Sequence, residues 1–152
     1  MALPNIFSVE VTDQIVGRIN QLSENTKPSW GKMDAAQMLA HCNVAYEMCF
    51  ENKHKKPGAV KRFLLKAFLK KLITNEAPYK RNSQTAPEFL ITSDKDFQTE
   101  KSRLIGYLRK TVEIGGPAFN NKESHSFGAL TATEWNNMFY KHLDHHLSQF
   151  NV

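Results

Sequence analysis

Cysteine is scarce in this sequence of 152 residues, which contains only Cys42 and Cys49. Their spacing corresponds to about 10 Å of rise along one helix, too far for a disulfide between them. No apolar run reaches the about 18–20 residues that cross a bilayer, and the first residues lack the pattern of a secretory signal peptide. We therefore expect a reduced, cytoplasmic protein.

Internal repeats, low-complexity segments and glycine-rich phosphate loops are also absent from the sequence. The hydrophobic fraction of 41% and the charged fraction of 23% are ordinary for a globular protein, which argues against extended disorder. A chain of this length suits one hydrophobic core. We expect residues 1–152 to form a single domain.

Alternating patterns typical of strands are nearly missing, and only Glu88 to Thr92 looks strand-like. Helical periodicity dominates and predicts an all-α fold, with four main helices and one additional basic helix. Residues 74–92 and 117–130 are interpreted as loops, and the first of them is a long crossover. The expected helices are one of about 15 residues around Val11 to Leu22, one from near Asp34 to the Lys56-Pro57-Gly58 stop, a basic one over Ala59 to Ile73, one from Ser93 or Asp94 to the Gly115-Gly116-Pro117 stop, and one from Thr131 to about Phe150.

Positive charge is concentrated in one segment. The chain has 20 Lys and Arg against 15 Asp and Glu, but residues 53–71 hold eight of these cations and no acid. The remainder, with 12 cations against 15 acids, is mildly acidic. The favoured interpretation of the basic helix is that it packs into the bundle with a solvated basic face. The alternatives are an anion-binding rim that uses Lys61, Arg62 and Lys66, then a surface for an anionic membrane or a partner; nucleic acid comes last, because exposed stacking aromatics are lacking.

Three of the six histidines fall on apolar helix faces. His142 follows Trp135 and Met138 on one face of the last expected helix, and His146 lies one turn further along. Imidazoles at i and i+4 are neighbours about 5–6 Å apart at Cβ, so they can bind one ion. His41 lies on the apolar stripe of the second helix and would supply a third ligand. The alternative is that these are hydrogen-bonded core residues, but two buried imidazoles on one stripe are costly to desolvate.

Two segments resemble the DinB/YfiT-like metalloenzyme superfamily. Residues 30–41, Trp-Gly-Lys-Met-Asp-Ala-Ala-Gln-Met-Leu-Ala-His, resemble its second helix, and residues 142–149, His-Leu-Asp-His-His-Leu-Ser-Gln, resemble its closing helix. The longer string over residues 125–150 is similar to a bacterial subfamily described only as a domain of unknown function. The resemblance implies a four-helix bundle, often dimeric, with a divalent metal on His41, His142 and His146. It also implies chemistry with low-molecular-weight thiols.

Four more residues are candidates for the surroundings of the metal. Gln149, one turn past His146, could orient a ligand. His145 points about 100° away from the shared face and is a neighbour rather than a ligand. Asp34 is better explained as a helix cap, and His125 as a loop residue, although both are retained as pocket candidates. Glu47, Asp144 and Glu134 lie off the stripe and are expected to be solvated.

Together these features predict a divalent-metal-dependent enzyme acting on a small molecule. An open position on the ion would activate water or a thiol near neutral pH, giving hydrolysis or thiol-dependent S-transfer. Imidazole ligands suit several transition metals, of which Zn²⁺ and Ni²⁺ are expected here. A low-molecular-weight thiol is the candidate co-substrate. The alternative is a non-catalytic helical module that binds metal, or that binds an anionic membrane or a partner through residues 53–71.

Overall fold

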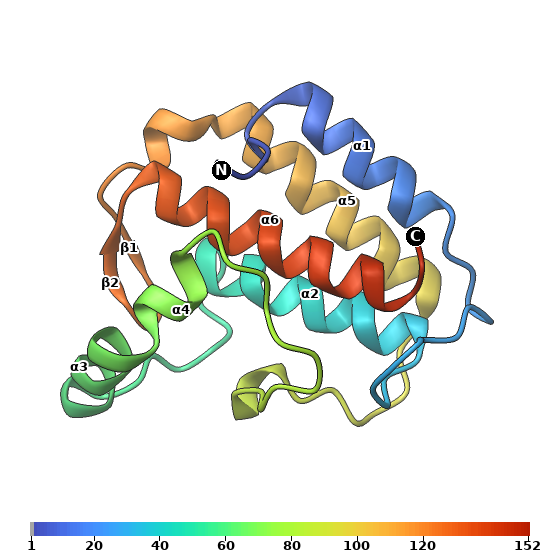
Figure 1. Ribbon diagram of the computed structural model, residues 1–152, viewed down its shortest axis with the longest axis horizontal. Coiled ribbons are helices and arrows are strands. Elements are labelled where there is room, and N and C mark those ends of the chain that lie inside the picture. The colour runs from blue at the N-terminus through green and yellow to red at the C-terminus, as the bar shows by residue number, and fades with distance from the viewer. Residues whose placement is uncertain (1) are drawn as a thin grey trace.

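The computed structural model describes residues 2–152, which form six α-helices and one two-stranded antiparallel sheet (Figure 1). The chain is mostly helical, as predicted. The helices are α1 (Val9–Asn20), α2 (Ala35–Phe50), α3 (Ala59–Phe68), α4 (Lys70–Thr74), α5 (Phe97–Ile114) and α6 (Ala132–Gln149), and the strands are β1 (Lys122–Ser124) and β2 (Gly128–Leu130). Two short 3-10 helices, η1 (Pro87–Phe89) and η2 (Gly116–Phe119), lie in the connections.

The long helices pack around α2, which contacts both α5 and α6, while α1 covers α5 and α6 from the other side. Of the 16 residues of α2, 11 are buried, so this helix is covered on most of its circumference. Its neighbour α6 contributes the large core side chains Trp135 and Phe139, which are at most 2% exposed. The two helices that carry the histidines therefore lie side by side on a well-packed core.

Capping boxes fix the starts of both histidine-bearing helices, and Asp34 caps its helix as predicted. The Asp34 carboxylate accepts a hydrogen bond from the Gln37 backbone, and the Gln37 side chain bonds back to the Asp34 backbone. Thr131 and Glu134 make the same reciprocal pair at the start of α6. Each box satisfies N–H groups that an α-helix leaves without partners at its first turn.

Three local expectations were wrong. The predicted loop 74–92 contains η1, which overlaps the strand-like residues Glu88 to Thr92, since Pro87 suits the first position of a helical turn. Helix α5 starts at Phe97, because Asp96, and not Ser93 or Asp94, caps it by accepting from the Thr99 backbone. The predicted loop 117–130 contains η2 and the β1–β2 hairpin, whose three-residue strands are too short for a period of two to be visible.

The basic helix also differs from its favoured interpretation. It breaks at Leu69 into α3 and α4, and α3 has no buried residue, so it does not pack into the core. It projects from one end of the molecule beside the hairpin (Figure 1). None of the helices in residues 2–152 is long and apolar enough to cross a membrane.

Candidate metal centre

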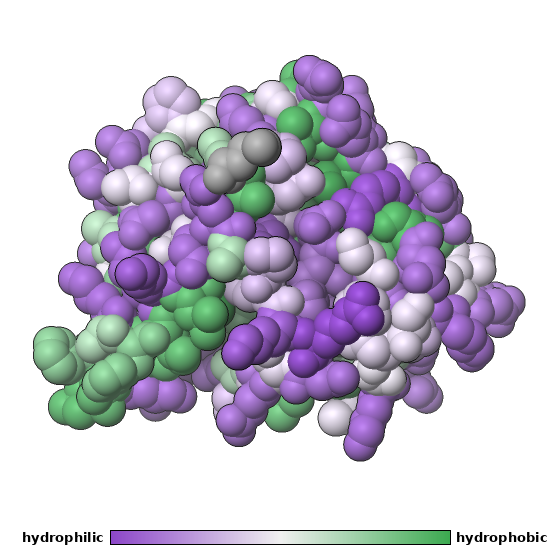
Figure 2. All heavy atoms as spheres, in the orientation of Figure 1, coloured by the Kyte–Doolittle hydropathy of each residue, from purple (hydrophilic) through white to green (hydrophobic). Residues whose placement is uncertain are grey.

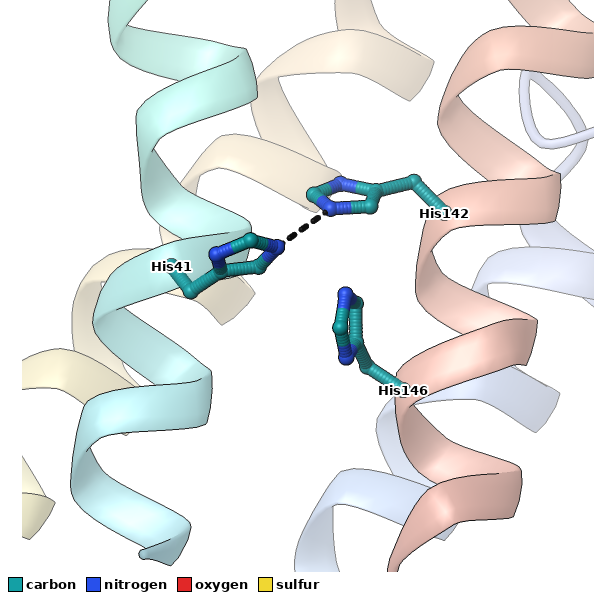
Figure 3. A group of neighbouring side chains, drawn as sticks. All are labelled: His41, His142 and His146. Carbon is teal, nitrogen blue, oxygen red and sulfur yellow. Dashed lines mark hydrogen bonds between the residues drawn. The ribbon is translucent and has the colours of Figure 1, made fainter. Parts of the chain in front are cut away.

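Three histidine side chains from α2 and α6 converge on one point (Figure 3). His41 extends from α2 toward α6, where His142 and His146 lie one turn apart on the facing side. One ring nitrogen from each can be chosen so that all three lie within 4.8 Å of one another. The Nε2 atoms of His41 and His142 are 2.9 Å apart. The spacing expected of a three-histidine site is thus present.

The far side of the His41 ring is fixed by the backbone. Its Nδ1 lies 2.8 Å from the carbonyl oxygen of Phe89 in η1. A carbonyl oxygen only accepts, so Nδ1 carries the proton and Nε2 presents its lone pair to the other histidines. The Phe89 ring packs edge-on against both His41 and His142, with centroids 5.3 and 5.7 Å away. The long crossover after α4 therefore closes over the site.

The far side of the His146 ring is fixed by Gln149. The Gln149 Nε2 donates a hydrogen bond of 2.6 Å to the Trp30 carbonyl, which orients the amide because a carbonyl can only accept. Its Oε1 then faces Nδ1 of His146 at 2.8 Å, so this nitrogen is the donor. His146 consequently also presents an unprotonated Nε2. Hydrogen bonds of this kind to the outer ring nitrogen are typical of metal-binding histidines.

His142 differs from the other two ligands. Because the Nε2 of His41 is unprotonated, the contact of 2.9 Å between the two rings requires the Nε2 of His142 to donate the proton. A metal ion at this point would require that proton to move to Nδ1 of His142. Within residues 2–152 this Nδ1 has no hydrogen-bond partner, so the proton can move there. His142 is only partly buried, whereas His41 and His146 are buried. Of the three ligands, His142 is therefore the one with some contact with solvent.

Burial keeps all three imidazoles neutral. It lowers the pKa of His41, lowers the pKa of His142 well below its ordinary value with help from His146, and lowers the pKa of His146 to about 3. Neutral imidazole is the form that binds a metal ion. Nitrogens bound to one tetrahedral Zn²⁺ at about 2.0–2.1 Å are about 3.3–3.4 Å apart, so three nitrogens within 4.8 Å of one another can reach that geometry through ring movements of about 1 Å.

One family model matches residues 5–152, and its description is "Protein of unknown function (DUF1569)". The chain belongs to this family. No curated protein and no solved structure matches the sequence.

An aromatic wall lies beside the histidines of this DUF1569 protein. His145 is off the shared face, as its position on the helix predicts, and its ring packs against Trp30 and Tyr79 with centroids 5.9 and 5.8 Å away. The guanidinium of Arg81 lies 4.1 Å above the Trp30 ring. The Trp30 ring thus contacts Arg81, and the Trp30 carbonyl accepts a hydrogen bond from the Gln149 amide that orients His146.

The remaining candidates lie elsewhere in the DUF1569 fold. Asp34 caps α2, and His125 bonds Ser126 and lines a separate cavity of about 300 Å³ with His54. Among the anion-binding candidates, Lys61 is exposed on α3 and Arg62 forms an ion pair with Glu123. Lys66 lines an open cavity of about 330 Å³ with other lysines.

Glu47 is buried rather than solvated. Its carboxylate accepts hydrogen bonds from Arg103 of α5 and from His54. Burial alone would raise the pKa of Glu47, but these bonds outweigh it and the pKa is lowered. This polar cluster joins α2 to α5 and shares no residue with the three-histidine group.

Sequence reasoning missed the two backbone carbonyls that orient the ligands, those of Phe89 and Trp30. A carbonyl leaves no residue-type signal, so only the fold reveals it. The resemblance over residues 30–41 did include Trp30, and that was the one usable sign that this loop belongs to the site.

Proposed function

We propose that this DUF1569 protein is a metal-dependent enzyme whose centre is one divalent ion, Zn²⁺ or Ni²⁺, on His41, His142 and His146. The observation that carries the proposal is the pair of hydrogen bonds on the outer nitrogens of His41 and His146. They leave both Nε2 lone pairs directed into one small space. An ion in that space would bind both lone pairs, and also that of His142 once its proton moves to Nδ1.

We also place the chain in the DinB/YfiT-like superfamily, with α1, α2, α5 and α6 as its four-helix bundle. Two observations support this assignment. The ligands come from the second long helix and the last one, as the resemblance implies, and these four helices make the main contacts of the fold. The two cysteines are free, which suits a reduced, cytoplasmic protein.

The favoured reaction is thiol-dependent S-transfer to a small molecule. A divalent ion on three neutral imidazoles supplies Lewis acidity, which lowers the pKa of a thiol or water at its open position. Hydrolysis at metal centres often uses a nearby carboxylate as general base. The group of possible ligands within residues 2–152 contains no carboxylate, and a thiol whose pKa is lowered by the ion could release its proton to solvent without one. Hydrolysis is the second candidate.

The chain's own residues then have separate tasks. The Phe89 carbonyl and Gln149 keep the proton of His41 and of His146 on Nδ1, so both imidazoles remain ligands. The Phe89 ring, which packs against His41 and His142, shields that side of the centre from water. The partly exposed side next to His142 is left for the substrate and the thiol.

Metal uptake tests the centre directly. Chelator-treated protein is titrated with Zn²⁺ and with Ni²⁺ by calorimetry, and one equivalent per chain is expected. His142→Ala should abolish uptake, while His54→Ala, which removes a histidine that bonds Glu47 instead, should leave it intact. Wild-type protein that takes up neither ion, or equal loss in both variants, would contradict the proposed ligands.

The thiol step has its own test. Co²⁺-loaded protein is mixed with a low-molecular-weight thiol, and a thiolate-to-cobalt absorption band in the near ultraviolet is expected. His54→Ala should give the same band as the wild type. If Co²⁺ binds but the thiol leaves the spectrum unchanged, S-transfer is excluded and the hydrolytic candidate takes its place.

A further inference from the structure

One surface of the molecule exposes a continuous row of large apolar side chains. On α3, Val60, Phe63 and Phe68 are 77%, 70% and 75% exposed, although a helix of a globular protein usually buries its apolar face. We refer to the whole row as the α3–α4 patch. Its members are Val60, Phe63, Leu64, Phe68, Leu69 and Leu72. Figure 2 shows it as a protruding apolar region over α3 and α4.

The orientation of α3 is set by its cationic face, which is turned toward the body. Arg62 forms an ion pair of 2.9 Å with Glu123 of β1, and Lys70 forms one of 2.9 Å with Glu134 of α6. The Lys66 side chain lies over Gly128 of β2. Since the polar residues of a helix and its apolar residues occupy opposite faces, these contacts direct the α3–α4 patch outward.

The helix pair is firmly held. Lys141 of α6 donates hydrogen bonds of 2.9 Å to the carbonyls of Leu72 and Asn75, at the end of α4. Asn137 of α6 donates one of 2.9 Å to the Thr74 carbonyl. The outward patch is thus attached to the same helix that carries two of the histidines, and it is a fixed surface.

Uncompensated positive charge surrounds the patch. Lys55, Lys56, Lys61 and Lys71 are exposed, and within residues 2–152 none of them forms an ion pair. Residues 53–71 contain no acid that could pair with them. Lys66 and Lys71 also line the open cavity of about 330 Å³ next to α4, where the ion pair between Lys70 and Glu134 forms another part of the wall. An apolar row bordered by cations is the pattern of helices that lie in the interface of anionic bilayers.

We propose that the α3–α4 patch docks on an anionic membrane surface. Phe63 and Phe68 enter the boundary between head groups and acyl chains, while the surrounding lysines contact lipid phosphates. The lysine-lined cavity accepts the phosphate of one head group. The two helices lie on the bilayer in this arrangement and do not cross it.

A second copy of the chain fits the patch less well. Helix α3 has 10 residues and is about 15 Å long at 1.5 Å per residue, and together with the five residues of α4 it offers less than the about 800 Å² that each partner of a stable interface usually buries. Pairing two patches would also bring two sets of lysines together without acids between them. Charge complementarity therefore favours the anionic lipid.

Vesicle flotation tests this proposal with the full chain. Vesicles of phosphatidylcholine with about 30% phosphatidylglycerol are compared with vesicles of phosphatidylcholine alone, at low and high salt. We expect binding to the anionic vesicles that weakens at high salt. The variant Phe63→Ser/Phe68→Ser should lose at least about tenfold in partitioning, because it removes the inserting rings. Val9→Ser, which changes a residue of α1 that is 60% exposed, is its matched control and should bind like the wild type.

A second pair of variants tests the charge. Lys61→Glu/Lys71→Glu should lose at least about tenfold in partitioning, whereas Lys27→Glu/Lys95→Glu, with the same change in net charge elsewhere, should not. None of these residues is buried, so all variants should keep the fold by circular dichroism and also keep their metal uptake.

Three results would overturn the proposal. One is the absence of binding to anionic vesicles at low salt. Another is equal loss in the patch variants and their controls. The third is a dimer in sedimentation that Phe63→Ser/Phe68→Ser converts to a monomer, because a second copy would then be the occupant.

Discussion

Gly31 lies so close to Gln149 that a β-carbon at position 31 would be 2.5 Å from the Nε2 of that amide. Gly31 also has a positive φ of 84°, which side chains other than glycine rarely adopt. The absence of a side chain at Gly31 leaves room for the Gln149 amide. This amide donates a hydrogen bond to the Trp30 carbonyl and accepts one from His146. The orientation of His146 on α6 therefore depends on a glycine at position 31, in the loop before α2.

Replacing Gly31, which is not a ligand, should weaken metal binding. In Gly31→Ala the new methyl displaces the Gln149 amide, His146 loses its acceptor, and we expect metal affinity to fall about 10–100-fold. Calorimetric titration with Zn²⁺ measures this. Gly17→Ala is the control, because a β-carbon there meets nothing within 4 Å; it should bind metal normally and be more stable by about 0.5–1 kcal/mol. Unchanged affinity in Gly31→Ala would show that Gln149 does not orient the ligand.

The protonation pattern of the ligands is a second prediction. In metal-free protein, ¹⁵N NMR should find His41 and His146 with the proton on Nδ1, because their Nδ1 atoms face acceptors. His142 should carry its proton on Nε2 and donate it to His41. Addition of Zn²⁺ should move only the proton of His142, to Nδ1. A His146 that is protonated on Nε2 in the absence of metal would contradict the arrangement.

The sequence sufficed for the ligands because helical periodicity determines which residues share a face. The periodicity places His142 and His146 on the Trp135 face of α6, and His41 on the buried stripe of α2. These positions do not depend on the conformation of the loops. The caps at Asp34 and Thr131 were predictable for the same reason, since they depend on residues three apart.

The rest depended on contacts between distant segments. Phe89 reaches His41 only because the crossover folds back over α2, 48 residues later in the chain. The outward turn of α3 was not predictable either, because its periodicity shows two faces without showing which one meets the body. Ion pairs to Glu123 and Glu134 decide that, and both partners lie more than 60 residues away.

The stability of metal-free protein should fall as the pH drops below neutral. The pKa of His146 is about 3 in the folded protein against an ordinary 6.5, so below pH 6.5 the unfolded chain binds a proton that the folded one does not. Each such group lowers the free energy of unfolding by up to about 1.4 kcal/mol per pH unit, and His146 keeps contributing until its folded pKa is reached. Urea denaturation at several values between pH 7.5 and 5 should show this decline, with a smaller slope in His146→Asn.

The buried carboxylate of Glu47 does not obscure that window, because its pKa lies below its ordinary 4.5. The group therefore remains ionised down to pH 5. A free energy of unfolding that is constant from pH 7.5 to 5 would mean that the three imidazoles are not held neutral by burial.

Lys141 should matter for the attachment of α4 rather than for the metal. It is 4% exposed, and its three hydrogen bonds, to the Leu72 carbonyl and to two oxygens of Asn75, are all 2.9 Å long. In Lys141→Met the apolar volume remains but these bonds are lost, so we expect amide hydrogen exchange over residues 70–80 to accelerate at least about tenfold.

The same substitution at an exposed position, Lys95→Met, is the control and should leave exchange unchanged. Because Lys141 bonds none of the three histidines, Lys141→Met should still take up one equivalent of Zn²⁺. Unchanged exchange over residues 70–80 would mean that the ion pair between Lys70 and Glu134 holds α4 by itself. Loss of metal uptake would mean instead that the end of α4 supports His142, the next residue along α6.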